Sequence, residues 1–400
     1  MVAVAAGAVT GVATRADAAP IIGGSAAQLG DFPNVVAIAI GSGSRFAVCT
    51  GELIEPDVVM TAAHCLAPAV VCPGLGLGSD CTQDQITALT TVFSGTVDLI
   101  TSRGSESAAA STVFDSKFDA TDLGHDDMGL IKLTAPVAGV TVALPNLHHG
   151  DAPAGMTVTM VGFGTTEQGG QGSVGEEFAL QNRASEPCSM LPALKGATAS
   201  DDNLLCYSQS DGKGKCEGDS GGPSFAVVNG KTKIVGITSF GDTSCAELGT
   251  DTRVDAEHRF LYSQVPDLEC ASDADCDGGR ACFSGQCTRL SGAGAIGDDC
   301  GKDADCDTGE CTAAPDGTKV CTIECAAAGA SDADTCPAEF ACETSGGSTS
   351  CFDGHAGGGC CDSGGGGGGG AAVLAMATVL VAGRRRRRRA GQVTDRLSQS

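Results

Sequence analysis

The chain has 400 residues, more than one ordinary domain needs, and its 22 cysteines indicate an oxidising compartment. The formal net charge of −25 excludes a nucleic-acid partner, because a strongly acidic surface repels phosphates. Zinc would need cysteines and histidines at ligand spacing, which we do not find, so we expect disulfides. A calcium site in the aspartate-rich C-terminal part stays open at this point.

Residues 1–20 are interpreted as an export signal followed by a short pro-peptide. The stretch 2–12 is small and apolar, and Ala16, Asp17 and Ala18 form a small-residue cleavage pattern. A buried N-terminal helix is the alternative, but the cysteine content favours export. We therefore expect a secreted protein.

Residues 21–265 are rich in Val, Ile, Thr and Gly and contain short alternating apolar runs. Two such runs are 34–40 and 156–161, and Gly, Pro and Asp separate runs of this kind. Many short strands predict an all-β sandwich or barrel. At the end of the segment, apolar residues recur with helical spacing over 255–265, which predicts a C-terminal helix.

Residues 266–355 contain 12 cysteines and almost no aliphatic core, so the segment needs covalent cross-links. The run from Cys270 to Cys276 recurs from Cys300 to Cys306, which predicts two small disulfide modules. The sequence leaves their cysteine pairing open. Their role as a stalk or as a binding module is also open.

Three separated motifs carry the chemistry of the chain. His64 lies in TAAHC, Asp127 begins DMGLIKL, and Ser220 lies in GDSGGP. A serine becomes a nucleophile when a base removes its proton and a third group orients that base. Glycines on both sides of Ser220 allow a tight turn, in which the amides of Gly218 and Ser220 converge on an oxyanion.

These motifs, in the order His, Asp, Ser, resemble those of the trypsin/chymotrypsin-like serine proteases over residues 21–265. The resemblance implies two packed six-stranded antiparallel β-barrels with a C-terminal helix and the active site between the barrels. It implies a serine endopeptidase that cleaves protein and peptide substrates through an acyl-enzyme intermediate. No metal or organic cofactor is implied.

In that resemblance, His64 is the general base, Asp127 orients it and Ser220 attacks the substrate. The amides of Gly218 and Ser220 form the oxyanion hole. Asp126 is the alternative to Asp127, but it stands one residue away from the family pattern. An inactive homologue acting as a surface binding or adhesion protein is the alternative function.

The resemblance also implies an activation step. Ile21 and the three residues after it resemble the mature N-terminus of the family, whose freed amine pairs with the aspartate before the catalytic serine, here Asp219. Pro20 stands where the family usually has Arg or Lys. We therefore expect a separate activating peptidase rather than trypsin-like activation.

The floor of the family's specificity pocket corresponds to Gly214, where trypsins carry Asp. We favour a large apolar side chain in this pocket. Asp251 would instead favour a basic side chain and Lys215 an acidic one, and both stay open. The pocket residues expected from the resemblance are Gly214, Lys215, Ser239, Phe240, Gly241, Gly249 and Asp251.

Four disulfides follow from the resemblance within this segment. Three are family bridges, and the fourth joins the two cysteines of an insertion after the histidine. The expected pairs are Cys49–Cys65, Cys188–Cys206, Cys216–Cys245 and Cys72–Cys81.

Residues 356–400 end in a different pattern. Cys360 and Cys361 precede a glycine run, an apolar stretch over 371–383 and six arginines over 384–389. The pattern resembles the myxobacterial-type cell-surface sorting tail. It implies sorting machinery, membrane contact and display at the bacterial surface. A plain hydrophobic membrane anchor is the alternative.

Overall fold

The structure is a computed structural model that describes residues 21–353 except 44, 79–80, 123, 149–150, 154, 166–174, 195–198, 266–267, 271, 277, 284, 326–335, 338–339 and 346–347. All described residues belong to one compact unit, Met1–Gly354. The predicted export signal and pro-peptide (1–20) lie outside the described residues. So does the predicted sorting tail (356–400), with Cys360, Cys361 and the hydrophobic segment.

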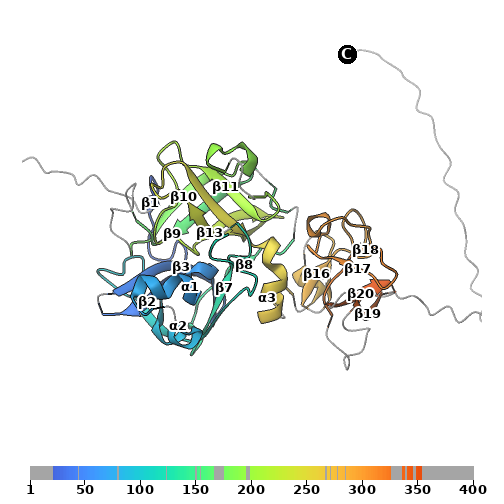
Figure 1. Ribbon diagram of the computed structural model, residues 1–400, viewed down its shortest axis with the longest axis horizontal. Helices are drawn as coiled ribbons and strands as arrows, with labels where there is room; N and C mark the ends of the chain where they lie inside the picture. Colours follow the sequence, from blue (N-terminus) through green and yellow to red (C-terminus); the bar gives the residue numbers. More distant parts are fainter. Residues whose placement is uncertain are drawn as a thin grey trace, which may run out of the picture. The chain divides into compact units, whose positions relative to one another are not determined.

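Six strands close the first barrel, drawn in blue to green in Figure 1, in the order β2-β3-β4-β7-β6-β5. The alternate residues Val36, Ile38 and Ile40 are fully buried in the cluster that fills this barrel. Val35 and Ala37, which alternate with these residues along the strand, join a cluster shared with the second sheet. The strands are β2 (Val35–Ser42), β3 (Arg45–Glu55), β4 (Val58–Thr61), β5 (Thr90–Ser94), β6 (Ser105–Phe114) and β7 (Gly129–Leu133).

Eight strands form the second sheet, in the order β1-β10-β9-β12-β13-β14-β11 with β8 beside β13. Its apolar cluster includes Ile21, Val158, Met160, Tyr207 and Val235. The strands are β1 (Ser25–Ala26), β8 (Leu144–Pro145), β9 (Thr157–Gly162), β10 (Phe178–Ala184), β11 (Leu204–Ser208), β12 (Pro223–Val228), β13 (Lys231–Gly241) and β14 (Leu248–Arg253).

The expectation of two closed six-stranded barrels was wrong for the second sheet, which is an open half-barrel. A single bridge connects its two edges, where the Glu186 amide donates to the Cys206 carbonyl at 2.8 Å. The chain then turns into η2 (Cys188–Met190), where the Cys188 amide donates to Asp201 Oδ1, so no ladder follows this bridge. The Cys188–Cys206 disulfide links the two edges covalently instead.

Helices are few and short in the described part of the chain. The predicted helix over 255–265 is present as η4 and α3. None of the described helices has the length and apolar character that crossing a bilayer requires. The helices are α1 (Pro68–Leu75), α2 (Gln83–Leu89), α3 (His258–Gln264), η1 (Ala63–Cys65), η2 (Cys188–Met190), η3 (Pro192–Leu194), η4 (Asp255–Glu257), η5 (Asp273–Asp275) and η6 (Asp303–Asp305).

The cysteine-rich segment contains three disulfide modules, not the two that the sequence repeat predicted. The third is hidden in the sequence because Cys325 and Cys336 are 11 positions apart, against 6 in the other two modules. Each module pairs its first cysteine with its third and its second with its fourth. The pairs are Cys270–Cys282, Cys276–Cys287, Cys300–Cys311, Cys306–Cys321, Cys325–Cys342 and Cys336–Cys351.

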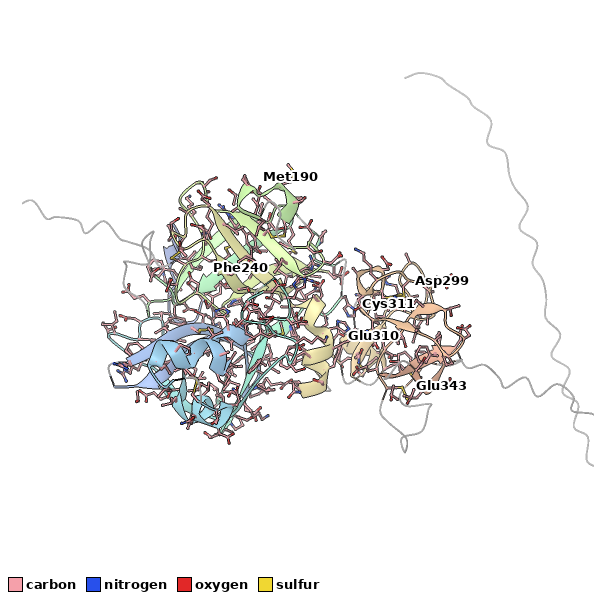
Figure 2. The ribbon with its side chains drawn as sticks, in the orientation of Figure 1. Met190, Phe240, Asp299, Glu310, Cys311 and Glu343 are labelled. Carbon is pink, nitrogen blue, oxygen red and sulfur yellow. A yellow bond between two sulfur atoms is a disulfide. The ribbon has the colours of Figure 1, made fainter. Side chains whose placement is uncertain are left out.

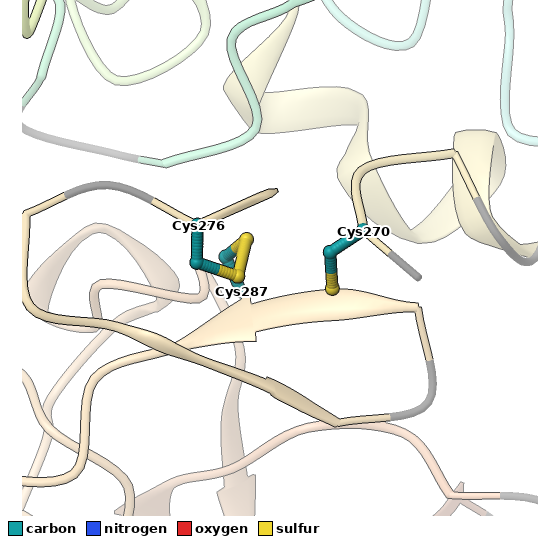
Figure 3. A group of neighbouring side chains, drawn as sticks. All are labelled: Cys270, Cys276 and Cys287. Carbon is teal, nitrogen blue, oxygen red and sulfur yellow. A yellow bond between two sulfur atoms is a disulfide. The ribbon is translucent and has the colours of Figure 1, made fainter. Parts of the chain in front are cut away.

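Each module also contains one two-stranded antiparallel sheet. Figure 2 labels Cys311 on the short sheet of the second module, and Figure 3 shows three cysteines of the first. Cys270, Cys276 and Cys287 in Figure 3 lie close together, but all three are in disulfides and offer no thiolate to a metal. The strands are β15 (Ala281–Phe283), β16 (Gln286–Thr288), β17 (Cys311–Ala313), β18 (Lys319–Cys321), β19 (Phe340–Ser345) and β20 (Ser348–Asp353).

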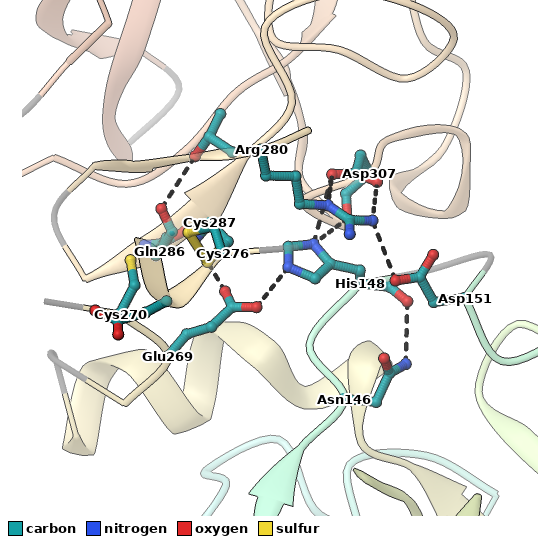
Figure 4. A network of polar contacts seen from close by, with 12 residues as sticks. Asn146, His148, Asp151, Glu269, Cys270, Cys276, Arg280, Gln286, Cys287 and Asp307 are labelled. Carbon is teal, nitrogen blue, oxygen red and sulfur yellow. Dashed lines mark hydrogen bonds and ion pairs between the residues drawn. A yellow bond between two sulfur atoms is a disulfide. The ribbon is translucent and has the colours of Figure 1, made fainter. Parts of the chain in front are cut away.

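A buried polar network joins the first two modules to the protease-like part (Figure 4). His148 Nε2 lies 2.6 Å from Glu269 Oε1, just after α3. Arg280 of the first module donates to Asp307 of the second at 2.7 and 2.6 Å and to Asp151 at 3.2 Å. The Arg280 side chain is fully buried, so these carboxylates supply the partners that its charge needs.

Candidate active site

A buried carboxylate holds the imidazole of His64. Asp127 Oδ2 lies 2.8 Å from His64 Nδ1, and Asp127 Oδ1 accepts the His64 backbone amide at 2.9 Å. Ser239 donates its hydroxyl to the same carboxylate at 2.5 Å. Asp126 forms no contact of this kind with His64 in the described part of the chain, so Asp127 is the aspartate that orients the ring.

Asp127 and His64 shift each other's pKa values. Burial raises the pKa of Asp127, but the charge and hydrogen bond of His64 and the Ser239 hydroxyl outweigh it and lower the pKa overall. Burial lowers the pKa of His64, and the Asp127 carboxylate more than reverses this effect. The aspartate therefore stays ionised, and the imidazole becomes a stronger base than an exposed histidine.

Ser220 lies on a tight turn between the first barrel and the second sheet, where its carbonyl accepts the Thr50 amide and the Gly221 amide donates to the Thr238 carbonyl. The Asp219 amide donates to the Cys216 carbonyl, and the Gly222 amide donates to the Asp219 carbonyl. Gly218 has a φ of 95°, and a Cβ at this position would lie 2.9 Å from the Cα of Gly164. A glycine is required there, because both the backbone angle and the close approach exclude a side chain.

His64 and Ser220 line the same pocket, a cavity of about 430 Å³. No hydrogen bond joins His64 Nε2 to the Ser220 hydroxyl in this structure. Catalytic hydrogen bonds are often long without substrate and shorten when it binds. Among the described residues, the amides of Gly218 and Ser220 have no acceptor, so both can donate to a ligand.

Ile21 is fully buried in the second sheet's cluster, and the carbonyl of Ile22 accepts the amide of Gly214 at 2.9 Å. Asp219 is also fully buried and accepts the amides of Gly164 and Cys216 at 2.9 and 2.8 Å. Burial raises its pKa to about 7. A neighbouring cation would lower this pKa again and favour the ionised form of the buried carboxylate.

Five of the seven predicted specificity residues line the pocket with His64 and Ser220. They are Lys215, Ser239, Phe240, Gly241 and Gly249, and Phe240 is labelled in Figure 2. Gly214 and Asp251 are not among the described lining residues. The structure therefore brings five of these seven residues to the cavity that His64 and Ser220 line.

The ammonium of Lys215 is held by side chains of the second sheet. It forms a close ion pair with Asp251, donates a hydrogen bond to Ser224 Oγ at 3.0 Å, and lies 5.4 Å from the ring centre of Tyr207. Lys215 is 5% exposed and Asp251 is fully buried. The two opposite charges are therefore paired with each other.

Gln209 lies against Gly214 and Gly249, the second of which lines the pocket, and it was missed in the sequence. Its Oε1 accepts the Lys215 amide at 2.6 Å, and its Nε2 donates to the Lys215 carbonyl at 3.1 Å. A Cβ added to Gly214 or to Gly249 would overlap this oxygen. The glutamine follows β11 far from any motif, and only its position in the fold reveals it.

The four disulfides of this part of the chain are those that the resemblance implied. Cys49–Cys65 anchors η1 and its histidine to β3, and Cys216–Cys245 fixes the turn that leads to Ser220. Cys188–Cys206 and Cys72–Cys81 are also formed. The elements that carry the histidine and the serine are thus covalently fixed beside the pocket.

Several known proteins are similar in sequence to this part of the chain. The family model described as Trypsin matches residues 21–260. A serine protease of Anopheles gambiae is 30% identical over 58% of this chain and 76% of its own length. A trypsin of Saccharopolyspora erythraea is 29% identical over 61% of this chain and 98% of its own length. Trypsin-1 of Astacus astacus is 29% identical over 57% and 92%. The chain therefore belongs to the trypsin family of serine proteases.

Proposed function

We propose that the chain is a secreted serine endopeptidase that cleaves peptide bonds with His64, Asp127 and Ser220. The observation that carries the proposal is the 2.8 Å contact between His64 Nδ1 and Asp127 Oδ2, in a pocket that Ser220 also lines. This contact makes Nδ1 the donor toward the carboxylate and leaves Nε2 to take a proton from the serine.

Each residue then has one task in the reaction. His64 takes the Ser220 proton as the oxygen attacks the substrate carbonyl, and the amides of Gly218 and Ser220 bind the resulting oxyanion. His64 returns the proton to the leaving amine, and an acyl-enzyme remains on Ser220. A water molecule, deprotonated by His64, then releases the second product.

Activation would follow release of a free amine at Ile21 by a separate peptidase. Two observations support this step: Ile21 is already buried, and the Asp219 carboxylate has backbone donors but forms no direct ion pair with a described residue. A new ammonium near Asp219 would ionise the carboxylate and fix the turn that carries Ser220. N-terminal sequencing of the active form is expected to start at Ile21, and active enzyme starting at Ala19 would contradict the step.

The pocket is expected to prefer an uncharged apolar side chain on the substrate. The Lys215–Asp251 pair leaves no net charge there, and Gln209 occupies space that a deeper pocket would offer. Digestion of a peptide library measures this preference directly. Dominant cleavage after Arg, Lys or Glu would contradict it.

Replacing Ser220 tests the central proposal. Ser220→Ala is expected to lower kcat on the order of 10⁶-fold while the protein stays folded. A fluorophosphonate probe should label the parent chain and the control Ser210→Ala, whose exposed serine lies outside the pocket, but not Ser220→Ala. Labelling of Ser220→Ala, or its normal turnover, would remove Ser220 from the mechanism.

The acidic limb of the activity profile is a second test. His64 must be neutral to act as a base, and its pKa lies above the ordinary 6.5. We expect kcat/KM to fall as the pH drops through this raised pKa, so the midpoint lies above pH 6.5. A midpoint below pH 6 would contradict the assigned pair with Asp127.

Surface display through residues 356–400 belongs to the same proposal and rests on the sequence pattern alone. Mass spectrometry of the mature chain tests it. A C-terminus near Cys360 or Cys361 on surface protein is expected, and an intact C-terminus at Ser400 would contradict sorting.

A further inference from the structure

Three acidic side chains meet behind the catalytic aspartate and take no part in the proposed mechanism. Asp115 follows β6, Asp126 directly precedes Asp127, and Glu257 ends η4. One carboxylate oxygen from each lies within 4.8 Å of the others. Segments far apart in the sequence therefore bring three negative charges to one point.

Two of these carboxylates are removed from water. Glu257 is 4% exposed and Asp115 is 7% exposed, while Asp126 is half-buried. Asp115 accepts the Lys117 amide at 2.8 Å. The Glu257 carboxylate accepts no hydrogen bond and forms no ion pair with any described residue. A buried carboxylate aimed at two others, with no partner of its own, lacks an explanation within the protein.

No described side chain neutralises the three acids. The charge of Lys117 acts on Asp126 and Glu257, but its side chain is exposed and forms no ion pair with them in the described part. Burial and mutual repulsion raise the pKa of both Asp126 and Glu257. Bringing the groups together is therefore unfavourable unless a cation joins them.

The ligand set and its dimensions fit calcium. All three ligands are carboxylate oxygens, which hard cations prefer, and no nitrogen or sulfur takes part. Two oxygens that bind one Ca²⁺ at about 2.3–2.6 Å are at most about 5 Å apart, in keeping with the observed separation. Mg²⁺ needs shorter contacts of about 2.0–2.1 Å and a stricter octahedron.

We propose that Asp115, Asp126 and Glu257 bind one Ca²⁺ ion directly behind the catalytic aspartate. Ca²⁺ takes roughly 6–8 oxygens, and the half-buried Asp126 leaves access for water to complete the shell. The ion links the connection between β6 and β7 to the segment that leads into α3. The Asp115 amide also donates to the Met128 carbonyl at 3.0 Å, so the ion stabilises the backbone on both sides of Asp127.

Calorimetry of the full chain tests the site without using activity. After treatment with a chelator, addition of CaCl₂ to about 100 times the Kd is expected to raise Tm by roughly 5–10 °C. Glu257→Gln and Asp126→Asn each remove one ligand charge and are expected to lose this response. Asn tolerates the left-handed φ of 55° at position 126, so the second variant adds no backbone strain.

The direction of the change in Tm without calcium distinguishes the loss of a metal ligand from a general destabilisation of the fold. Both variants remove repulsion, so without calcium they are expected to melt at the same temperature as the parent chain or higher. The control Asp122→Asn removes an exposed charge from the same connection and no ligand, and is expected to keep the full response. Titration calorimetry is expected to show one fewer calcium site in Glu257→Gln than in Asp122→Asn.

Three results would overturn the proposal, two on the site and one on the ion. One is a chelator-treated parent chain whose Tm does not respond to CaCl₂. Another is a calcium response of equal size in Glu257→Gln, which would place the bound ion elsewhere, for instance among the aspartates of the modules. An equal response to MgCl₂ would reject calcium as the selected ion. None of these results depends on Ser220 or on peptidase activity.

Discussion

The protease domain and the cysteine-rich modules reach a folded state by different means. The barrel and the half-barrel bury large apolar clusters, with residues such as Ile38, Leu53 and Met60 fully inaccessible. The described cluster of the modules has only two buried aliphatic residues, Ile296 and Ile323, and is otherwise built around cysteines. Burial of apolar surface stabilises the first region, whereas cross-links that restrict the unfolded chain stabilise the second.

Reduction of all disulfides is expected to produce the largest difference in stability between the two regions. The module disulfides span 11 to 17 residues, and each contributes about 3 kcal/mol by restricting the unfolded chain. We expect the modules to unfold completely while the barrel core stays protected. Hydrogen exchange with mass spectrometry measures both regions at once. Slow exchange in fully reduced modules would contradict the comparison.

Breaking the network between the regions has the next largest expected effect. Arg280→Ala leaves the buried Asp307 carboxylate without its two-point partner and should lower the free energy of unfolding by about 3–5 kcal/mol. The control Lys302→Ala breaks an exposed ion pair with Asp202, and its effect should stay below about 1 kcal/mol. Equal effects in denaturant titrations would show that burial of the network does not matter.

A cavity in the first barrel should act on one region alone. Leu53→Ala removes a fully buried side chain, which should lower the free energy of unfolding of the barrels by about 2–5 kcal/mol. Protection of module amides should not change in hydrogen exchange. Val227→Ala, at a side chain 73% exposed, is the control and should stay within about 0.5 kcal/mol. Loss of module protection in Leu53→Ala would mean that the regions unfold together.

The smallest expected effect is a pH dependence of the contact between the regions. Burial lowers the pKa of His148, but the charge and hydrogen bond of Glu269 outweigh burial, so the pKa of His148 is raised overall. Burial raises the pKa of Glu269, but His148 and other hydrogen-bond donors outweigh burial, so the pKa of Glu269 is lowered overall. The His148 contribution is complete below pH 6.5 and is lost as the pH rises through its raised pKa. The Glu269 contribution is complete above pH 4.5 and is lost as the pH falls through its lowered pKa.

Stability of the parent chain should therefore include a contribution that is largest between pH 4.5 and 6.5. His148→Gln should flatten this part of the dependence of Tm on pH. An unchanged curve in His148→Gln would exclude the pair as its source.

Local sequence patterns were enough to select the proposed triad residues, of which the structure joins His64 and Asp127 by a direct contact. His64, Asp127 and Ser220 each lie in a short motif whose glycines, cysteine or apolar strand constrain them locally. The approach of His64 to Asp127 follows from the family resemblance. The open edge of the second sheet at Glu186 and Pro187 was not predicted, because closure of a sheet into a barrel depends on how two strands distant in sequence pair.

Contacts between distant segments account for what the sequence did not reveal. Gln209 carries no motif, and its importance comes only from the glycines that face it. Asp126 was considered as an alternative to Asp127, whereas its described neighbours are Asp115 and Glu257. The third module escaped detection because its cysteine spacing differs from the repeat. Each of these features depends on the three-dimensional register, which local composition does not determine.

The alternating cysteine pairing of the first two modules affects their resistance to proteolysis. A cleavable segment must first detach and enter an active site in extended form, which requires local opening. In these modules the segment between the second and third cysteines lies inside both disulfide loops, and each outer segment lies inside one, so at least one covalent link limits the opening of every segment. The modules are therefore suited to resist digestion by the enzyme that carries them.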